Sequence, residues 1–202
     1  MNEIISIDID GVLNYYPQCW LDYINKICGI SFTDKNEAKK ELGIERYKQI
    51  KNNYRKSSYK ENLEVNKEAV SFLKKIKSRG VKIIISTSRP IYNKAKFPGL
   101  EKLTINWLNK NNIPYDTLIY KDEEAEFIVK VPNLLFHIDD QLIYANAIAK
   151  KGVRVFLYNS NENNFPLKNL DYINSNIIKV ENIDSIFEVV PELRDKVINN
   201  SS

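Results

Sequence analysis

Short runs of apolar, β-branched residues recur along the chain and are separated by polar stretches. Because nearly every position in these runs is apolar and each run is too short for a helix, we interpret them as fully buried strands. The predicted strands are residues 3–9, 81–87, 115–120, 134–139 and 153–158, with a further short one at 176–180.

Helical patterns fill most of the intervals between these strands. One helix is bounded by Asn66 as a cap and by Gly80 as a stop, and its apolar positions recur at helical spacing. Others are predicted at 100–111, 122–130 and 141–151 and after Asn182, with an Asn-rich loop at 159–165. Alternating strands and helices predict an α/β fold: a three-layer, Rossmann-like sandwich with a parallel sheet.

Residues 14–65 interrupt this alternation, because they contain helical patterns and no strand. Helices are predicted from Pro17 to Gly29, from Asp34 to Gly43 and over 44–56. The stretch directly follows the first strand, at the end where open α/β sheets bind ligands. We therefore expect a helical cap at 14–65 and a catalytic core formed by 1–13 and 66–202.

Composition narrows the class of protein only a little. The chain has 202 residues, a formal net charge of +4 and 43% hydrophobic residues, which suits one soluble domain with an insertion. No apolar run reaches the roughly 18 residues of a membrane helix, and the chain enters a strand at once, without a signal segment. We expect a cytoplasmic protein without a membrane partner, and the small charge does not by itself indicate nucleic acid.

Polar residues that can take part in catalysis or bind a metal stand where three of the predicted strands end. These ends read DIDG (8–11), STSR (86–89) and DD (139–140). Ends of parallel strands lie side by side, so the carboxylates repel one another unless a cation neutralises them, and Mg²⁺ is the usual cation beside phosphate. Gly11 allows a sharp turn and a close approach of the backbone to a ligand.

This pattern predicts the chemistry of a phosphatase. Magnesium held by Asp8, Asp139 and the Asp10 carbonyl would screen the phosphate, and Asp8 would attack phosphorus to form an aspartyl-phosphate. Asp10 would protonate the leaving oxygen and then activate water. Thr87 would hold a phosphoryl oxygen, and a lysine would neutralise charge. Signal-receiver domains also combine Asp, Thr and Lys, but they are shorter and begin with an adjacent acid pair.

Three of these segments together resemble a known family. DIDGVL (8–13), STSR (86–89) and HIDD (137–140) resemble the first, second and fourth motifs of the haloacid-dehalogenase-like (HAD) phosphatases. The resemblance covers the core, roughly residues 3–13 and 66–160. It implies a HAD-type core with a small cap inserted after the first strand.

The resemblance also implies roles for individual residues. Asp8 would be the nucleophile, Asp10 the general acid and base, and Thr87 the phosphate ligand. Asp139 would be a metal ligand, and Asp140, which matches the second acid of the fourth motif, supports the metal site. The metal set is thus Asp8, Asp10, Asp139 and Asp140.

The lysine of the family pattern has no exact counterpart. Counting back from Asp139 without gaps puts it near Glu124, whereas Lys121 lies three residues earlier, about one helical turn. Lys130 stands at the other end of the predicted helix. We predict that Lys121 fills this role.

Other residues are candidates for binding the substrate. Arg89 could grip a phosphate or a base edge with its planar fork, and Ser88 could offer its backbone N–H. Tyr15 and Tyr16, the aromatics nearest the first turn, could stack on a base. His137 lies inside the fourth strand, and we interpret it as a core histidine rather than a catalyst.

Within the family, the layout is similar to the cytosolic and mitochondrial 5′(3′)-deoxyribonucleotidases and to bacterial proteins assigned as 5′-nucleotidases. That likeness implies a Mg²⁺-dependent phosphomonoesterase acting on (deoxy)nucleoside monophosphates. Alternatives are another small-metabolite phosphatase, a polynucleotide 3′-phosphatase, and a non-catalytic binding module with the same fold. The sequence does not determine the oligomeric state.

Overall fold

The computed structural model describes residues 3–122, 126–158 and 174–194, and the chain divides into two compact units. The first unit comprises Met1–Leu13, Asn66–Arg89 and Ile113–Ser202. The second contains the whole stretch expected to form a cap, Asn14–Val65, and in addition Pro90–Asn112. Each unit is described by itself below.

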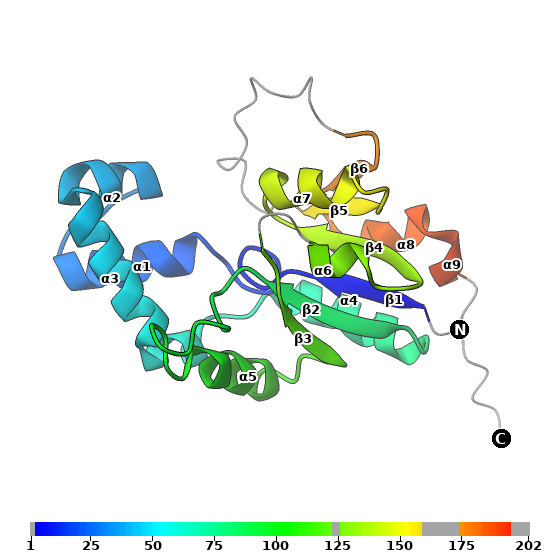
Figure 1. Cartoon of the computed structure of the whole chain (residues 1–202), viewed down its shortest axis with the longest axis horizontal. Coiled ribbons are helices and arrows are strands. Elements are labelled where there is room, and N and C mark those ends of the chain that lie inside the picture. Colours follow the sequence, from blue (N-terminus) through cyan, green and yellow to red (C-terminus); the bar gives the residue numbers. More distant parts are fainter. Residues whose placement is uncertain (1–2, 123–125, 159–173, 195–202) are drawn as a thin grey trace. The chain divides into compact units, whose positions relative to one another are not determined.

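The first unit is built on a parallel sheet of six strands in the order β3-β2-β1-β4-β5-β6 (Figure 1). The predicted parallel α/β fold is thereby confirmed. The apolar runs form the strands because both faces of the sheet are covered. The strands are β1 Ile4–Ile7, β2 Lys82–Thr87, β3 Thr117–Tyr120, β4 Leu134–Asp139, β5 Val155–Tyr158 and β6 Ile177–Val180.

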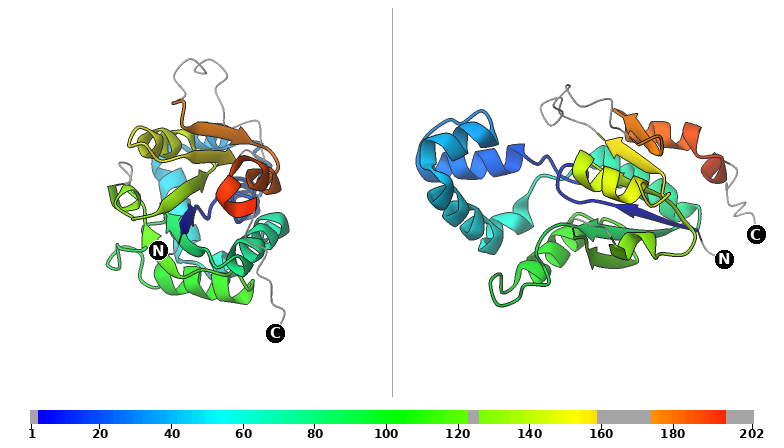
Figure 2. Two further views of the ribbon diagram at one scale, coloured as in Figure 1. Left: turned by 90° about the vertical axis from the view of Figure 1, so that its right-hand side faces the viewer. Right: turned by 45° about the horizontal axis from the view of Figure 1, so that its top comes forward.

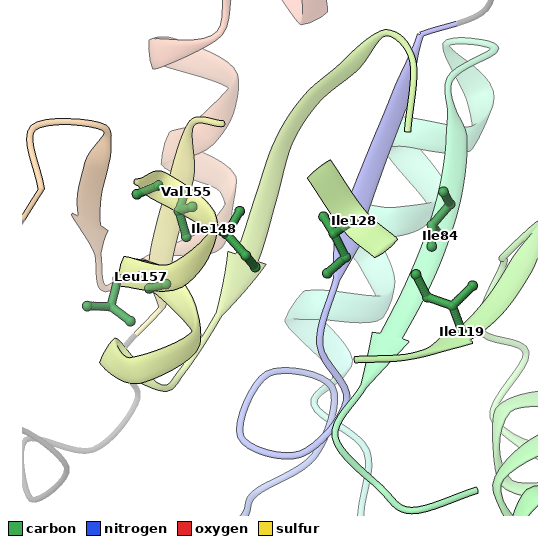
Figure 3. Close-up of a cluster of buried hydrophobic side chains, with 8 residues drawn as sticks. Ile84, Ile119, Ile128, Ile148, Val155 and Leu157 are labelled. Carbon is green, nitrogen blue, oxygen red and sulfur yellow. The ribbon is translucent and has the colours of Figure 1, made fainter. Parts of the chain in front are cut away.

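Helices cover both faces of this sheet (Figure 2). On one face lie α6 (Glu126–Val129) and α7 (Leu142–Ala149), which enclose an apolar cluster against the strands (Figure 3). The other face carries α4 (Lys67–Ser78) and α8 (Ile186–Val189), whose Phe72 and Phe187 rings lie 5.0 Å apart. A short η4 (Ile183–Ser185) precedes α8, and α9 (Pro191–Arg194) follows it.

The cap of α4 behaves as the sequence predicts. The side chain of Asn66 accepts hydrogen bonds from the backbone N–H groups of Glu68 and Ala69, which have no partner inside the helix. The same side chain donates to the Val12 carbonyl at 3.0 Å. Asn66 therefore both starts the helix and ties it to the turn that follows β1.

The second unit is helical. Asp34 caps its helix as predicted, accepting from the N–H groups of Asn36 and Glu37. The rings of Trp20 and Tyr54 lie 5.2 Å apart, and the Trp20 indole N–H donates to the Tyr47 hydroxyl, so these aromatic side chains form a core. The elements are α1 Gln18–Cys28, α2 Lys35–Leu42, α3 Ile44–Lys56, η1 Ser58–Asn62 and α5 Leu100–Lys110.

Several helices and strands have other bounds in the structure than the sequence predicts. The strand expected over 3–9 covers Ile4–Ile7 in the structure. The helix expected over 122–130 is helical over Glu126–Val129. The Asn-rich loop at 159–165 lies outside the described residues. Among the described helices, none has both the length and the apolar character needed to cross a bilayer.

Replacing Ile148 by Ala should lower the free energy of unfolding by about 2–4 kcal/mol, because this side chain is fully buried between α7 and the sheet. The matched control lies on the same helix. Ile143 is 61% exposed, so Ile143→Ala should change the free energy by less than about 0.5 kcal/mol. Urea unfolding measures both, and equal losses would contradict this packing of α7.

Candidate active site

The candidate site lies where β1 and β4 run side by side. Asp8 directly follows β1, and its backbone N–H donates to the Ile138 carbonyl at 2.9 Å, so it lies beside Asp139 at the end of β4. Further strands are added on one side as β2 and β3 and on the other as β5 and β6. In open α/β sheets such a switch in strand order is where ligands bind.

Three acids meet at this point, as the sequence predicts they would. The side chains of Asp8, Asp139 and Asp140 are buried, and each offers a carboxylate oxygen within 4.8 Å of the others. The ammonium of Lys121, also buried, lies 3.3 Å from Asp8 Oδ1 and donates a hydrogen bond to Asp139 Oδ2. Four ionisable side chains therefore lie together in the protein interior.

The backbone explains how Lys121 reaches the acids although it stands early in the sequence. It follows β3 directly, and its N–H donates to the Thr87 carbonyl at 2.8 Å, which continues the pairing of β3 with β2. Its side chain then extends along the ends of the strands toward β1 and β4. Lys130 is exposed and lies 3.5 Å from Glu126, away from the acids, and Glu124 is outside the described residues.

Burial and mutual repulsion change the acidity of the cluster. Burial raises the pKa of Asp8 to about 7, with Asp139 and Asp10 adding to the shift against the opposing effect of Lys121. Burial, Asp139 and Asp8 likewise raise the pKa of Asp140 well above its ordinary value. Burial acts the same way on Asp139, but Lys121 and His137 outweigh it and lower the pKa to about 2.

The hydrogen-bond partners separate the three acids into two kinds. Asp139 Oδ2 accepts from Lys121 and from His137 Nε2 at 3.0 Å, and Oδ1 accepts from the Gln141 N–H at 2.9 Å. Both oxygens of Asp8 and both of Asp140 are buried without a hydrogen-bond partner among the described residues. Buried oxygens left in this way fit a hard divalent cation, which takes carboxylate oxygens as ligands.

Asp10 is held by an arginine. Arg89 Nε donates to Asp10 Oδ2 at 2.8 Å and Nη2 donates to Oδ1 at 2.6 Å, so the guanidinium grips the carboxylate with two parallel bonds. The Arg89 N–H also donates to Thr87 Oγ1 at 3.1 Å, which leaves the Thr87 hydroxyl its own proton to donate. The structure thus joins two residues that the sequence treated separately.

Gly11 is needed for the acids to approach. Its φ of +98° is unfavourable for residues with a side chain, and an added Cβ would lie 2.1 Å from Asp140 Oδ2. The close approach that the structure shows at Gly11 is to Asp140, and the predicted approach of a ligand stays a prediction. Only glycine lets the turn after β1 fit against the end of β4.

One further residue reaches the site and was not expected from sequence. The ring of Tyr144, in the first turn of α7, lies with its centroid 4.3 Å from Lys121 Nζ. Burial raises the pKa of its hydroxyl, and the neighbouring Ser88 opposes that shift. The only signal in the sequence is its position one helical turn after the acid pair.

The two tyrosines predicted to contact a substrate belong to the second unit. Tyr15 is partly exposed, and the hydroxyl of Tyr16 accepts a hydrogen bond from Lys51 Nζ at 3.2 Å. Lys51 also lies 4.6 Å from the centre of the Tyr16 ring. Their role as substrate contacts stays a prediction.

Gly11→Ala should disrupt the site more than it disrupts a glycine turn elsewhere. The matched control is Gly152, which has φ +87° and no atom within 4 Å of an added Cβ. Gly152→Ala should cost only the backbone strain, about 1–2 kcal/mol. Gly11→Ala should cost more, because Asp140 must move as well. Thermal unfolding of both variants compares them, and equal losses would contradict the close approach to Asp140.

Asp8→Asn should stabilise the chain in the absence of divalent cations, increasingly as pH rises from about 4 to about 7. The folded state binds a proton on Asp8 that the unfolded chain releases at its ordinary pKa of 3.8, so the wild type loses stability across this window. Asn carries no such proton. The difference in the free energy of unfolding between Asp8→Asn and the wild type should therefore reach on the order of 1–4 kcal/mol. Urea unfolding in a chelator measures it.

Asp34→Asn is the control for this experiment, because Asp34 is exposed and Asn also caps helices. It measures what replacing a carboxylate by an amide does to stability at an exposed position. If the stability difference between Asp8→Asn and the wild type did not change with pH, the carboxyl of Asp8 would not be protonated in the folded state.

No protein-family model and no curated protein matches the chain. Solved structures do match it over nearly its full length. A chain described as a predicted phosphatase from Clostridium acetobutylicum superposes with a TM-score of 0.66 and 13% identity, covering 95% of this chain and 99% of that chain.

Two further structures carry more specific descriptions. A hydrolase of the haloacid dehalogenase-like family from Streptococcus pneumoniae matches with a TM-score of 0.60 and 13% identity, covering 93% of this chain and 98% of its own. The D,D-heptose 1,7-bisphosphate phosphatase of B. bronchiseptica, solved with magnesium and phosphate, matches with a TM-score of 0.60 and 11% identity. The match covers 94% of this chain and 98% of that chain. At these identities the likeness concerns the fold, and this chain has the fold of the haloacid-dehalogenase-like hydrolases.

Proposed function

We propose that the protein is a magnesium-dependent phosphomonoesterase in which Asp8 is the nucleophile. The observation that carries this proposal is a pair of buried carboxylates, Asp8 and Asp140, whose oxygens have no hydrogen-bond partner among the described residues and which lie beside the Lys121 ammonium. Buried charges arranged in this way lower the stability of the folded state unless a cation and an anionic ligand bind beside them. The fold supports the proposal, because structures with this fold include chains described as phosphatases.

Asp8 begins the reaction. Its carboxylate oxygen forms a bond to phosphorus while the bond from phosphorus to the ester oxygen breaks, which gives an aspartyl-phosphate and an alcohol. Lys121, 3.3 Å from Asp8 Oδ1, offsets negative charge on the transferring group. The Thr87 hydroxyl, oriented by the Arg89 N–H, donates to a phosphoryl oxygen.

Asp10 moves the protons. It donates one to the leaving ester oxygen, and it then takes one from the water that attacks the aspartyl-phosphate, so that inorganic phosphate leaves and Asp8 is restored. While Arg89 grips both oxygens of Asp10, that carboxylate is held in its ionised form. A phosphate dianion competes for the same guanidinium, and a shift of Arg89 toward it would let Asp10 carry the proton.

The cation itself would be held by the oxygens of Asp8 and Asp140 that lack a hydrogen-bond partner among the described residues, with the Asp10 carbonyl as the third protein ligand, as the strand-end pattern predicts. When bound, it supplies charge neutralisation that lets a phosphate approach the carboxylates. Asp139 remains a predicted ligand from the sequence. Its oxygens, however, already accept three hydrogen bonds from protein donors, so we propose that its main task is to hold Lys121.

For the substrate, we propose a nucleoside monophosphate, with the deoxyribonucleotides as the first class to test. The layout resemblance to the 5′(3′)-deoxyribonucleotidases and the aromatic residues Tyr15 and Tyr16 support this choice. Another small phosphorylated metabolite and a 3′-phosphorylated nucleic acid end are the competing substrates. A cytoplasmic location is part of the same proposal.

The purified protein should hydrolyse p-nitrophenyl phosphate with Mg²⁺ and lose activity in a chelator. Asp8→Asn should lower kcat by at least about 10³-fold, because the attacking carboxylate is gone. Asp184→Asn is the matched control, since Asp184 forms an exposed ion pair with Lys75 at 2.5 Å and should leave activity unchanged. The rate of phosphate release measures the activity of the wild type, Asp8→Asn and Asp184→Asn.

Substrate choice is decided in the same assay. Equal concentrations of deoxyribonucleoside and ribonucleoside monophosphates, sugar phosphates and a 3′-phosphorylated oligonucleotide are compared by kcat/KM. A preference for the oligonucleotide or the sugar phosphates would reject the nucleotidase proposal and keep the phosphatase. A wild-type protein that hydrolyses none of these would instead indicate a non-catalytic binding module.

A further inference from the structure

Two polar side chains stand between apolar ones on the four central strands of the sheet. On neighbouring strands, Ile84, Ser6, His137 and Val155 stand in register. Residues in register on parallel strands point to the same face, and Ile84 and Val155 belong to the apolar cluster under α6 and α7. Ser6 and His137 are fully buried there. Burying such groups is costly unless each finds a partner.

Their partners form a hydrogen-bonded chain that ends at the candidate active site. Ser6 Oγ lies 2.6 Å from His137 Nδ1, and His137 Nε2 lies 3.0 Å from Asp139 Oδ2. The same Asp139 oxygen accepts from Lys121. The chain therefore runs from the middle of β1, through β4, to the lysine beside Asp8.

The chemistry of the groups fixes the direction of each bond. The ionised Asp139 carboxylate only accepts, so His137 Nε2 must carry a proton and donate it. In a neutral ring Nδ1 then lacks a proton, and the Ser6 hydroxyl donates to it. Ser6 thus selects the histidine tautomer that Asp139 requires.

The consequence for Asp139 is that it cannot turn. Oδ2 is held by His137 and Lys121, and Oδ1 by the Gln141 N–H. Because Lys121 is bonded to this fixed carboxylate, its ammonium stays 3.3 Å from Asp8 Oδ1. Without His137, Asp139 loses one of three restraints, and Lys121 loses a fixed anchor.

We propose that His137 is a positioning residue that, with Ser6, orients Asp139 and thereby places Lys121 at the nucleophile Asp8. The catalytic consequence rests on the proposed phosphatase function. The competing explanation is that Ser6 and His137 only satisfy each other inside the core. That explanation predicts an effect on stability alone.

The first test reads the histidine directly, because His137 is the single histidine of the chain. Long-range ¹H–¹⁵N spectra of the metal-free, histidine-labelled protein should show a protonated Nε2 and an unprotonated Nδ1. In Ser6→Ala the Nδ1 resonance should move, since its donor is gone. A proton on Nδ1 with a bare Nε2 in the wild type would overturn the proposal, whatever the enzymatic activity.

The second test separates positioning from folding. His137→Leu should lower kcat for p-nitrophenyl phosphate by about 10–100-fold while KM changes little, because Lys121 acts on the transferring group. His137→Gln should recover most of the loss, since its amide N–H₂ can donate to Asp139 in place of Nε2. Phe156→Leu is the control: it removes a buried ring of β5 that packs on Phe136, so it should lower thermal stability without changing kcat.

The outcomes separate the two proposals. Wild-type turnover in His137→Leu, or an equal loss in a folded His137→Gln, would overturn the positioning role. If the wild type has no phosphatase activity, the proposed function fails, and the tautomer spectra still decide whether His137 donates to Asp139. If His137→Leu does not fold, the kcat of His137→Gln and the ¹H–¹⁵N spectra decide the positioning role.

Discussion

Repulsion among buried carboxylates is the constraint on which the rest of this site depends. Asp8, Asp139 and Asp140 converge within 4.8 Å because their strands are neighbours in a parallel sheet. The Gln141 N–H stabilises only Asp139, so side chains from other elements must offset the charge of the remaining carboxylates. Lys121 comes from the end of β3 for this purpose, and the raised pKa values of Asp8 and Asp140 show that one lysine is not enough.

Much of the fold follows from local sequence. The apolar runs predict every strand of the sheet, and the caps at Asp34 and Asn66 form the hydrogen bonds their positions indicate. Period and capping are local properties, which is why they can be predicted. The inclusion of residues 90–112 in the second unit depends instead on contacts between distant segments, such as the Trp107 indole donating to the Leu63 carbonyl at 2.8 Å.

The site was predictable in its members more than in its connections. Acids at strand ends indicate Asp8, Asp139 and Asp140, because parallel strands place those ends together. The pairing of Asp10 with Arg89 and the chain from Ser6 to Asp139 depend on side-chain rotamers, about which residue spacing says nothing. Spacing also misplaces the lysine by about a turn, because a long, flexible side chain reaches the acids from the strand end itself.

Charge balance connects the metal to the protons. Four carboxylates, those of Asp8, Asp10, Asp139 and Asp140, face the cations of Lys121 and Arg89, and with every group ionised the site keeps an excess of negative charge. The raised pKa values of Asp8 and Asp140 favour protons on these carboxyls, which offset part of that excess, and a divalent cation would offset it in their place. Protons and the proposed cation would thus compete for the same oxygens. Under the proposed function, a cation that displaced the proton would leave Asp8 ionised at a pH where the metal-free carboxyl is partly protonated, and a protonated carboxyl is a poor nucleophile. The electrostatic cost of crowding these acids together would in that way couple cation binding to the reactivity of Asp8.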